Sequence, residues 1–523
     1  MKSGVKPPQS KDRLSSVPTQ TGGGSAGMGL TFCECMSIGE SMIHPSENEY
    51  LRLAKDYDLI PVYLEVLADM ETPVSVLQRF VDRENAFLLE SMEGGETWGR
   101  YSFVGIDPKL LLDIDHSNGK TGKLEHLRNV YRGLKVAEIP GLPRFFGGAV
   151  GFTGYEAMAE FERMPAPKKS GSPVIARSRF LKADKIIVFD NIRHTVKIVI
   201  CTRPREGGSP SDIYRAAMSE IEAIASTIER DIPTSHAKPY PAVTFKSNME
   251  RRDYTDMVKK AKKYIYDGDV IQVVLSQRFS AESKVPPVQL YRALRLLNPS
   301  PYTSFLKIGK QTLVGSSPEV MVRLTGSRVE LRPIAGTRPR GATEQEDRRL
   351  ADELLADEKE KAEHVMLVDL GRNDIGRVAE SGSVQVTEYM VIERYSHVMH
   401  MVSHVEGILR KEFDAYDVIK ATFPAGTLSG APKIRAMEII HELEPDPRGA
   451  YGGAVGYVSY SGNMDLAITI RTLDITDDIA AIQAGAGIVY DSDPEREFEE
   501  TCHKARGMQK AVEMAANGLD VSP

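Results

Sequence analysis

Residues Lys185–Thr202, KIIVFDNIRHTVKIVICT, decide the fold class. The apolar runs KIIVF and VKIVI lie on either side of Asp190-Asn191, a pair of residues typical of turns. This pattern predicts two antiparallel strands joined as a hairpin. Other expected strands also come in hairpin-like pairs, with helices between groups of them, rather than in a regular β-α-β repeat. We therefore predict an α+β fold with large, mainly antiparallel β-sheets.

A short glycine-rich sequence occurs twice in the chain. Residues 147–152 read GGAVGF, and residues 452–457 read GGAVGY. Chance similarity of glycine-rich strands is one explanation. We favour the other explanation, in which the two segments are equivalent strands in two related sheets.

The chain divides into two globular blocks. Residues 1–45 are rich in Gly, Ser, Pro, Lys and Gln, which predicts a disordered N-terminal extension, with a non-native extension as an alternative. The first block spans residues 46–230, a proline-containing linker spans 231–247, and the second block spans 248–515. Residues 516–523 form a C-terminal tail.

Composition and charge argue against several classes of protein. Of the 523 residues, 41% are hydrophobic and 27% are charged, as in globular proteins. The net charge of −7 gives no support for a nucleic-acid or membrane-surface partner. No apolar run reaches transmembrane length. Four scattered cysteines do not form a disulfide framework, so we expect a cytoplasmic protein with reduced thiols.

Two pairs of glutamates point to a metal site. Glu360 and Glu363 lie three residues apart in the helical run Ala351–Leu367, so they share a helix face. Glu497 and Glu500 repeat this spacing in a second helical run near the C-terminus. Each pair alone is more typical of a solvated acidic face. If the two helices converge, the four carboxylates suit a hard divalent cation such as Mg2+.

Glycines and a lone arginine point to an anionic ligand. In IQAGAGI, residues 482–488, Gly485 and Gly487 would let backbone N–H groups approach an anion, and a tight turn at a sheet edge is the alternative. Arg471 lies in the apolar strand pattern AITIRT. A buried arginine needs an anionic partner, which is either a protein carboxylate or a substrate carboxylate.

Three further residues are candidates for catalysis. His400 lies in YSHVMHMVSHVEG, where strand alternation puts it on one face with His404 and puts His397 on the other, so the three form no evident metal triad. Thr427 lies in a loop before a helix, where a cap is its simpler role. Glu319 begins a strand-like run, and it would be a general acid if an apolar wall raises its pKa.

Seven motifs together resemble those of the chorismate-utilising enzymes, over roughly residues 50–513. They are SSPE (316–319), RPIAGTRPRG (332–341), LVDLGRNDIGRV (367–378), YSHVMH (395–400), GTLSGAPK (426–433), YGGAVGY (451–457) and QAGAGIVYDSDPE (483–495). Within the family, the motifs are most similar to those of anthranilate synthase large subunits. The resemblance implies large antiparallel sheets packed as a sandwich with helices on the outside. It also implies conversion of chorismate and ammonia to anthranilate and pyruvate, in tryptophan biosynthesis, with Mg2+.

The resemblance assigns roles to residues of this sequence. Those that match the Mg2+ site are Glu363 and Glu500 as principal ligands, with Glu360 and Glu497 as nearby or water-mediated partners. Those that match catalytic positions are His400, Thr427 and Glu319, the last as the acid that helps the C4 hydroxyl leave. Those that match chorismate-binding positions are Gly336, Thr337, Tyr451, Arg471, Gly485, Ala486 and Gly487.

Two positions separate this sequence from related activities. Ala335 stands where aminodeoxychorismate synthases typically have a nucleophilic lysine, so ammonia itself is expected to attack chorismate. Gln272 stands where isochorismate and salicylate synthases have a lysine that activates water, and a neutral amide cannot be that base. The alternatives are an aminodeoxychorismate synthase large subunit, which Ala335 disfavours, and a catalytically silent scaffold of the same fold.

The resemblance also implies a partner subunit. Anthranilate synthase large subunits normally receive ammonia from a separate glutamine amidotransferase subunit. Cys201 and Cys502 lack the G-x-C-x-G setting of an amidotransferase nucleophile, so glutamine hydrolysis must come from another chain.

Two segments resemble a site for tryptophan as a feedback inhibitor. They are LLES, residues 88–91, and NPSPYTSF, residues 298–305. An ordinary strand end is the alternative for LLES. The residues expected to contact the inhibitor are Ser91, Pro301, Tyr302 and Thr303, the last in place of the usual methionine.

Overall fold

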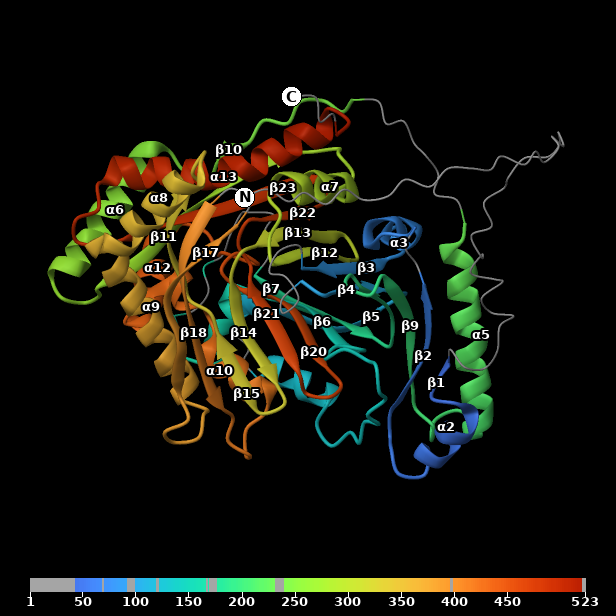
Figure 1. Ribbon diagram of the computed structural model, residues 1–523. Helices are drawn as coiled ribbons and strands as arrows, with labels where there is room; N and C mark the ends of the chain where they lie inside the picture. Colours follow the sequence, from blue (N-terminus) through green and yellow to red (C-terminus); the bar gives the residue numbers. More distant parts are fainter. Residues whose placement is uncertain are drawn as a thin grey trace, which may run out of the picture.

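Two β-sheets form the middle of the molecule, and helices cover them on the outside (Figure 1). The computed structural model describes residues 43–67, 70–91, 99–118, 122–165, 168, 176–230, 239–395 and 398–519. All pairings between the named strands of these residues are antiparallel. The predicted fold class, α+β with large antiparallel sheets and outer helices, is confirmed.

The first sheet has 13 strands in the described chain. Its order is β1 (Ile43–His44), β2 (Ile60–Leu67), β9 (Thr195–Thr202), β8 (Lys185–Asp190), β4 (Tyr101–Gly105), β3 (Asn85–Glu90), β12 (Tyr302–Ile308), β13 (Gln311–Ser317), β22 (Thr472–Thr476), β23 (Ile479–Ile488), β11 (Gln272–Glu282) and β10 (Lys246–Ser247), with β19 (Gly430–Ala431) also on β11. The expected hairpin is β8 with β9, and Asp190 pairs with Thr195 where the chain turns.

The second sheet has 10 strands in the described chain. Its order is β16 (Ile334–Pro339), β18 (Val398–Ile408), β15 (Arg328–Leu331), β14 (Val320–Thr325), β21 (Met464–Ile468), β20 (Ala454–Ser459), β6 (Gly148–Thr153), β7 (Arg177–Ala183) and β5 (Lys109–Asp115), with β17 (Gln385–Arg394) also on β18. The strand β18 carries the candidate catalytic residue His400.

The two glycine-rich segments pair directly with each other, so the expectation that they lie in two related sheets is wrong. They are β6 and β20, which are neighbours in the second sheet, and Gly151 faces Gly456 across the pair. A Cβ on Gly151 would lie 2.1 Å from the carbonyl oxygen of Arg179, and one on Gly456 would lie 2.1 Å from that of Asp465. The repeated sequence is explained by close approach of adjacent strands on both sides of the pair.

Both sequence blocks contribute strands to both sheets. In the first sheet β3 pairs with β12, and in the second β6 pairs with β20. The proposed domain boundaries stay predictions. Of the segments outside the two blocks, residues 1–42, 231–238 and 520–523 lie outside the described residues, whereas Lys246–Ser247 of the expected linker form β10.

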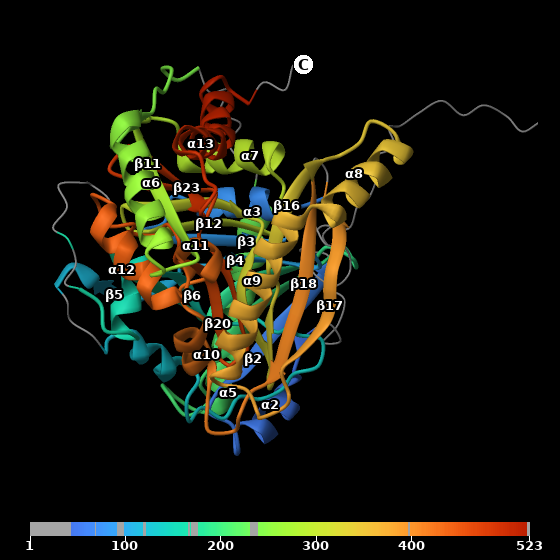
Figure 2. The same cartoon turned by 90° about the vertical axis from the view of Figure 1, so that its left-hand side faces the viewer.

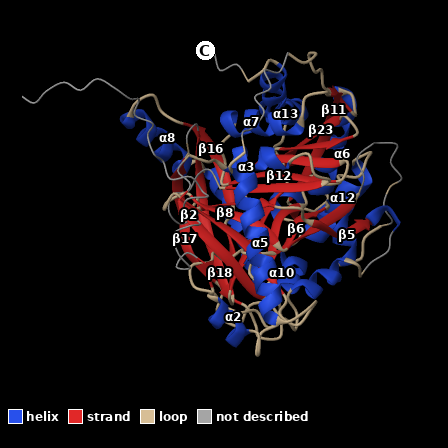
Figure 3. Ribbon diagram, turned by 90° about the vertical axis from the view of Figure 1, so that its right-hand side faces the viewer, coloured by secondary structure: helices blue, strands red, loops and turns tan. Residues whose placement is uncertain are grey.

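Helices cover opposite sides of the sheets. Figure 2 shows α6, α9, α12 and α13 on one side, and Figure 3 shows α5 crossing the other. The helices are α2 (Glu47–Leu53), α3 (Pro73–Phe80), α5 (Pro210–Ile228), α6 (Arg251–Tyr266), α7 (Pro287–Leu297), α8 (Glu344–Ala356), α9 (Glu358–Gly376), α10 (Ala415–Thr422), α11 (Gly426–Ser429), α12 (Lys433–Leu443) and α13 (Pro494–Ala516), with 3-10 turns η2 (His116–Asn118), η3 (Leu124–Val130) and η4 (Tyr155–Glu160).

The helical run expected over residues 351–367 is two helices rather than one. Asp357 ends α8 and begins α9, because its side chain accepts hydrogen bonds from the N–H groups of Lys359 and Glu360. The two predicted metal ligands Glu360 and Glu363 still share a helix, α9.

One hydrophobic cluster contains buried side chains of both sheets, so the sheets share a core. Phe103 of β4 and Tyr457 of β20 meet edge to face with ring centres 6.0 Å apart, and Phe145 stacks on Tyr457 at 4.4 Å. None of the described helices has the length and apolar character that a membrane span requires.

Candidate active site

The candidate site is built around a bulge where β16 meets β18. The pairing passes from Ala335–Met401 to Thr337–His400 and leaves Gly336 without a partner. Gly336 has φ of 64°, which favours glycine, and a Cβ there would lie 2.7 Å from Leu354 Cδ1. The bulge directs the Gly336 carbonyl at the His400 ring. Residues Ile334–Pro339 are therefore a bulged strand.

The contacts of the His400 ring define its tautomer. Nδ1 lies 2.9 Å from the carbonyl oxygen of Gly336 and 3.1 Å from Oγ1 of Thr337. Because a carbonyl can only accept, Nδ1 carries the proton and Nε2 is left as an acceptor. Burial lowers the pKa of His400, the Gly336 carbonyl partly offsets this, and the Arg471 guanidinium lowers it further. The ring is thus a neutral imidazole suited to accept a proton at Nε2.

Arg471 is held in the same site without an anionic protein partner. It lies between β21 and β22, outside the strand expected there, with φ of 48°. No hydrogen bond or ion pair joins its guanidinium to the residues that the structure describes. Water reaches the side chain through a cavity of 780 Å³ that Glu500 and Lys504 also line, while the surrounding protein desolvates the guanidinium and lowers its pKa. This setting suits a ligand carboxylate.

The predicted anion-binding residues Gly485, Ala486 and Gly487 lie inside β23 rather than in a turn. The strand β22 pairs with β23 only as far as Ile482, so beyond that point β23 has a strand on one edge only within the described chain. Lys504 Nζ donates to the Gly485 carbonyl at 3.0 Å. Because strand alternation repeats every two residues, the N–H of Gly487 faces the same edge as that of Gly485. The Gly485 N–H interacts with the Tyr451 hydroxyl, so this edge offers the Gly487 N–H and the Tyr451 hydroxyl as donors beside Lys504.

Close contacts explain the two glycines of β23. A Cβ on Gly485 would lie 2.8 Å from the Tyr451 hydroxyl, and one on Gly487 would lie 2.4 Å from Gln272 Nε2. The Gln272 amide also lies 3.5 Å from the carboxylate of Glu363. These contacts bring Tyr451, β23 and a predicted metal ligand into one place.

A buried ion pair between Arg448 and Glu444 holds the elements around Tyr451 in this arrangement. The Arg448 side chain, with Arg448 only 2% exposed, donates to both carboxylate oxygens of Glu444 at 2.9 and 2.6 Å. It also donates to the carbonyls of Leu428 in α11 and Val274 in β11, at 2.7 and 2.8 Å. Its guanidinium carbon lies 5.6 Å from the ring centre of Tyr451. One side chain thereby connects α11, β11 and Tyr451.

Arg448 is not among the residues predicted from the sequence. Its only local signal is the spacing of four residues from Glu444, which usually indicates an exposed helical pair. Here α12 ends at Leu443, so the pair lies just after the helix and is buried.

Glu319 and Thr427 form the acidic part of the site. Burial raises the pKa of Glu319 to about 8, and the Thr427 hydroxyl offsets part of this rise. Thr427 lies in α11 rather than in the expected loop. Its buried hydroxyl is close enough to Glu319 to affect the pKa of that carboxyl, but it forms no hydrogen bond of ordinary geometry in the described chain. Glu319 is therefore mostly protonated at neutral pH and is able to donate a proton.

The glutamates predicted to bind Mg2+ lie on α9 and α13, whose N-terminal parts converge here. Lys359 of α9 is close enough to Glu497 of α13 to influence the pKa of that carboxyl. Burial raises the pKa of Glu497, and the neighbouring charge of Glu500 adds to the rise. On α9, burial likewise raises the pKa of Glu360, and Glu363 adds to it.

The donor atoms of these glutamates fit a hard divalent cation. All are carboxylate oxygens, and a bound cation would relieve the repulsion and desolvation that raise the pKa values of Glu360 and Glu497. In the structure Lys504 lies 2.7 Å from Glu500, and Arg338 lies 3.6 Å from Glu360. No three of the glutamates bring ligand atoms within 4.8 Å of one another in the described chain, so cation binding would need their side chains to rotate.

A larger cavity, of 940 Å³, lies apart from these residues. Its lining includes all four residues expected to contact tryptophan, Ser91, Pro301, Tyr302 and Thr303. The segments LLES and NPSPYTSF contribute to the neighbouring strands β3 and β12, and Glu90 pairs with Thr303. The Tyr302 hydroxyl donates to Asp465 at 2.9 Å.

Residues 84–510 match the model of a protein family described as chorismate binding enzyme. The chain belongs to this family. It is 46% identical over 497 residues to anthranilate synthase component 1 of Acetivibrio thermocellus, an alignment that covers 91% of this chain and 99% of the relative. It is also 46% identical over 493 residues to the Pseudomonas putida protein of the same name, with 90% and 99% covered. The expected resemblance is confirmed.

Solved structures of chorismate-binding enzymes agree with the fold. Anthranilate synthase component I from Streptococcus pneumoniae TIGR4 superposes with a TM-score of 0.71 at 38% identity, covering 80% of this chain and 95% of that chain. The menaquinone-specific isochorismate synthase from Escherichia coli superposes with a TM-score of 0.67 over 89% of this chain and 98% of that chain. At 18% identity, the second comparison shows a shared fold only.

Substituting Arg448 by Met is expected to lower the free energy of unfolding by about 3–5 kcal/mol, because Glu444 would be left buried and unpaired. Urea denaturation followed by circular dichroism measures the change. The matched control is Arg435→Met, which removes a more exposed ion pair with Asp269 at 2.9 Å. We expect the control to change stability by less than about 1 kcal/mol. Equal losses in the two variants would contradict the importance of the buried pair.

Proposed function

We propose that this chain is the large subunit of an anthranilate synthase. It would add ammonia to C2 of chorismate with loss of the C4 hydroxyl, and then eliminate pyruvate to leave anthranilate. The observation that carries the proposal is Ala335 at the bulge beside His400, in a chain 46% identical to proteins named anthranilate synthase component 1. Alanine has no nucleophilic atom, so the incoming nitrogen must be ammonia itself.

Substrate binding follows from the charges of the site. Chorismate is a dicarboxylate, and the unpaired guanidinium of Arg471 is suited to take one carboxylate together with backbone N–H groups of β23. Mg2+ held by Glu363 and Glu500, with Glu360 and Glu497 nearby, would bind the other carboxylate and stabilise negative charge that develops on it. Protein groups on opposite sides would thereby orient the ring.

Proton transfer follows from the states of two side chains. Glu319, with its pKa raised to about 8, donates a proton to the C4 hydroxyl as that group leaves. His400 has its Nε2 free, because Nδ1 donates to Gly336, and it accepts the C2 proton during elimination. Burial and Arg471 keep this imidazole neutral, which is the form that a base needs.

Use of glutamine requires a second subunit in this proposal. The Cys201 thiol is buried, lies 3.3 Å from the Phe146 carbonyl, and has a pKa raised by burial, so it is not an activated nucleophile. Cys502 also has a pKa raised by burial. The chain would therefore receive ammonia from a glutamine amidotransferase subunit, in the cytoplasm, and would use ammonium salts when isolated.

Two other functions have specific observations against them. An aminodeoxychorismate synthase would need a nucleophile at the position of Ala335. A silent scaffold would have no need for a protonated Glu319, a neutral His400 and an Arg471 that has no anionic partner in the described chain. Water as the nucleophile is disfavoured by Gln272, whose amide lies 3.5 Å from Glu363 and cannot act as a base.

The first test is the reaction itself. The purified chain, incubated with chorismate, Mg2+ and ammonium at mildly alkaline pH, is expected to give anthranilate and pyruvate in equal amounts, detected by fluorescence and mass spectrometry. Removal of Mg2+ should stop turnover, and glutamine should not replace ammonium. Aminodeoxychorismate without pyruvate, or no product with ammonium, would contradict the proposal.

Glu319→Gln is expected to lower the turnover number by roughly 10²-fold or more, because an amide cannot donate the proton. In the unchanged enzyme kcat/KM should fall as the pH rises through about 8, where Glu319 loses its proton. This alkaline limb should be absent from the residual activity of Glu319→Gln. Glu229→Gln, which alters an exposed glutamate at the end of α5, is the control and should keep the full profile.

We further propose that tryptophan binds in the 940 Å³ cavity and inhibits the reaction. Saturating tryptophan should therefore reduce activity, and Ser91→Phe should weaken the inhibition by filling the cavity while leaving ammonia-dependent turnover in place. Ser461→Phe, in an exposed turn, serves as the control. Full activity at saturating tryptophan would rule out feedback inhibition.

A further inference from the structure

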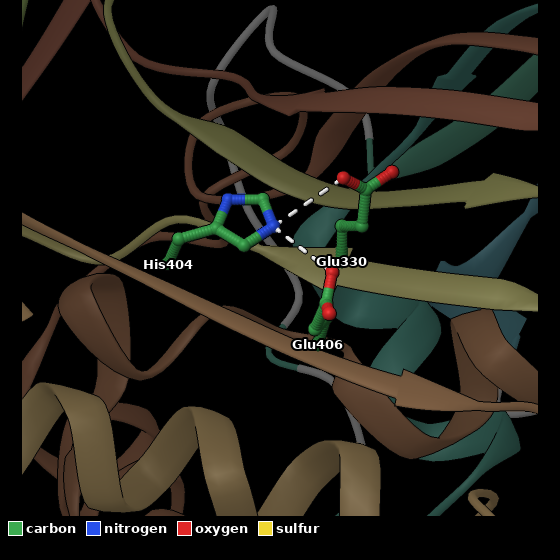
Figure 4. A group of neighbouring side chains, drawn as sticks. All are labelled: Glu330, His404 and Glu406. Carbon is green, nitrogen blue, oxygen red and sulfur yellow. Dashed lines mark ion pairs between the residues drawn. The ribbon is translucent and has the colours of Figure 1, made fainter. Parts of the chain in front are cut away.

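Three potential metal ligands lie together on the second sheet, in the wall of the 940 Å³ cavity. Glu330 of β15 stands directly opposite Glu406 of β18 in the strand register. His404 precedes Glu406 by two residues, so its side chain lies on the same face. Figure 4 shows the imidazole edge of His404 pointing between the two carboxylates.

The separations suit ligands around a shared cation better than direct ion pairs. Nε2 of His404 lies 3.3 Å from a Glu330 oxygen and 3.7 Å from a Glu406 oxygen, and all three ligand atoms lie within 4.8 Å of one another. Charge-assisted hydrogen bonds between such groups are about 2.7–2.9 Å long. In a tetrahedral zinc site with bonds of about 2.0–2.1 Å, neighbouring ligand atoms are about 3.3 Å apart.

The charges of the cluster also favour a cation. Two carboxylates directly opposite each other on paired strands repel and destabilise the pairing. Their side chains are only 15% and 21% exposed, so water screens this repulsion incompletely. Arg328 lies 3.4 Å from Glu406, and Arg323 and Arg144 carry further positive charge near Glu330, so arginines offset part of this negative charge.

We propose that Glu330, His404 and Glu406 bind a divalent cation of the Zn2+ class. One imidazole and two carboxylates suit such a borderline cation, whereas Mg2+ prefers an octahedral shell of oxygen atoms. The fourth position would open to the cavity and take water. The site is separate from the glutamates of α9 and α13, and it depends neither on the proposed reaction nor on tryptophan. Its bound cation would connect β15 to β18, the strand that also carries His400.

The test uses Zn2+ as the probe in the presence of excess Mg2+, which occupies oxygen-only sites. After equilibrium dialysis, elemental analysis of the full chain is expected to give one equivalent of Zn2+. Co2+ in place of Zn2+ should give the intense visible absorption of a tetrahedral site. His404→Ala should lose the bound metal and the absorption. His126→Ala, which removes an exposed imidazole from η3, should retain both.

A second variant keeps the result decisive if His404→Ala is poorly folded. Glu330→Gln preserves side-chain shape and should weaken Zn2+ binding at least tenfold, with circular dichroism confirming an unchanged fold. Absence of stoichiometric Zn2+ from the unchanged chain would overturn the proposal. Equal binding by the unchanged chain and by a folded His404→Ala or Glu330→Gln variant would also overturn it, because the metal would then lie elsewhere and the cluster would be an ordinary set of ion pairs.

Discussion

The pair of Arg448 and Glu444 is the constraint on which the candidate site depends. A buried guanidinium must use its donors, and this one uses them on Glu444 and on carbonyls of α11 and β11. Glu444 in turn accepts from the backbone and the hydroxyl of Ser276, both at 2.8 Å. Ser276 and Gly485 face each other as a pair without hydrogen bonds between them, so the Ser276 N–H points to Glu444 and the Gly485 carbonyl points to the open edge of β23. A charge pair that the substrate would not touch thus holds β11 and α11 beside the edge that would receive a substrate anion.

The chemistry of the site comes from polar groups held in states that they would not have in water. Arg471 is charged but has no anionic partner among the described residues, His400 is neutral, and Glu319 is mostly protonated at neutral pH. Each state has a local cause, which is isolation in a cavity for Arg471, burial together with the nearby charge of Arg471 for His400, and burial for Glu319. Because these states are energetically unfavourable in the empty site, binding of a complementary ligand lowers the free energy of the site.

Local patterns in the sequence were enough to predict the hairpin of β8 and β9 and the helical run near the C-terminus that holds Glu497 and Glu500, which is α13. Residue types and spacing were enough to identify the glutamate pairs and Arg471 as candidates. Contacts between distant segments could not be predicted in this way. Two prolines and three arginines make the stretch 332–341 unfavourable for a strand, yet it contains β16, and its arginines are neutralised by carboxylates of other elements. These pairs are Arg332 with Glu393, Arg338 with Asp357 at 2.8 Å, and Arg340 with Asp347 at 2.7 Å. The role of Arg448 was missed for the same reason, since its partners come from segments far apart in the sequence.

The pairing of β6 with β20 has a consequence for how the chain is made. Gly148 is hydrogen-bonded into a ladder opposite Ser459, so the middle of the second sheet joins residues from distant parts of the chain. On the ribosome β6 emerges long before its partner strand exists. Until β20 follows, an apolar glycine-rich strand has one edge without its native neighbour, and such edges are prone to wrong pairing. The second sheet is therefore completed late in biosynthesis. Until then the first half of the chain remains incompletely folded, and chaperones are suited to protect it.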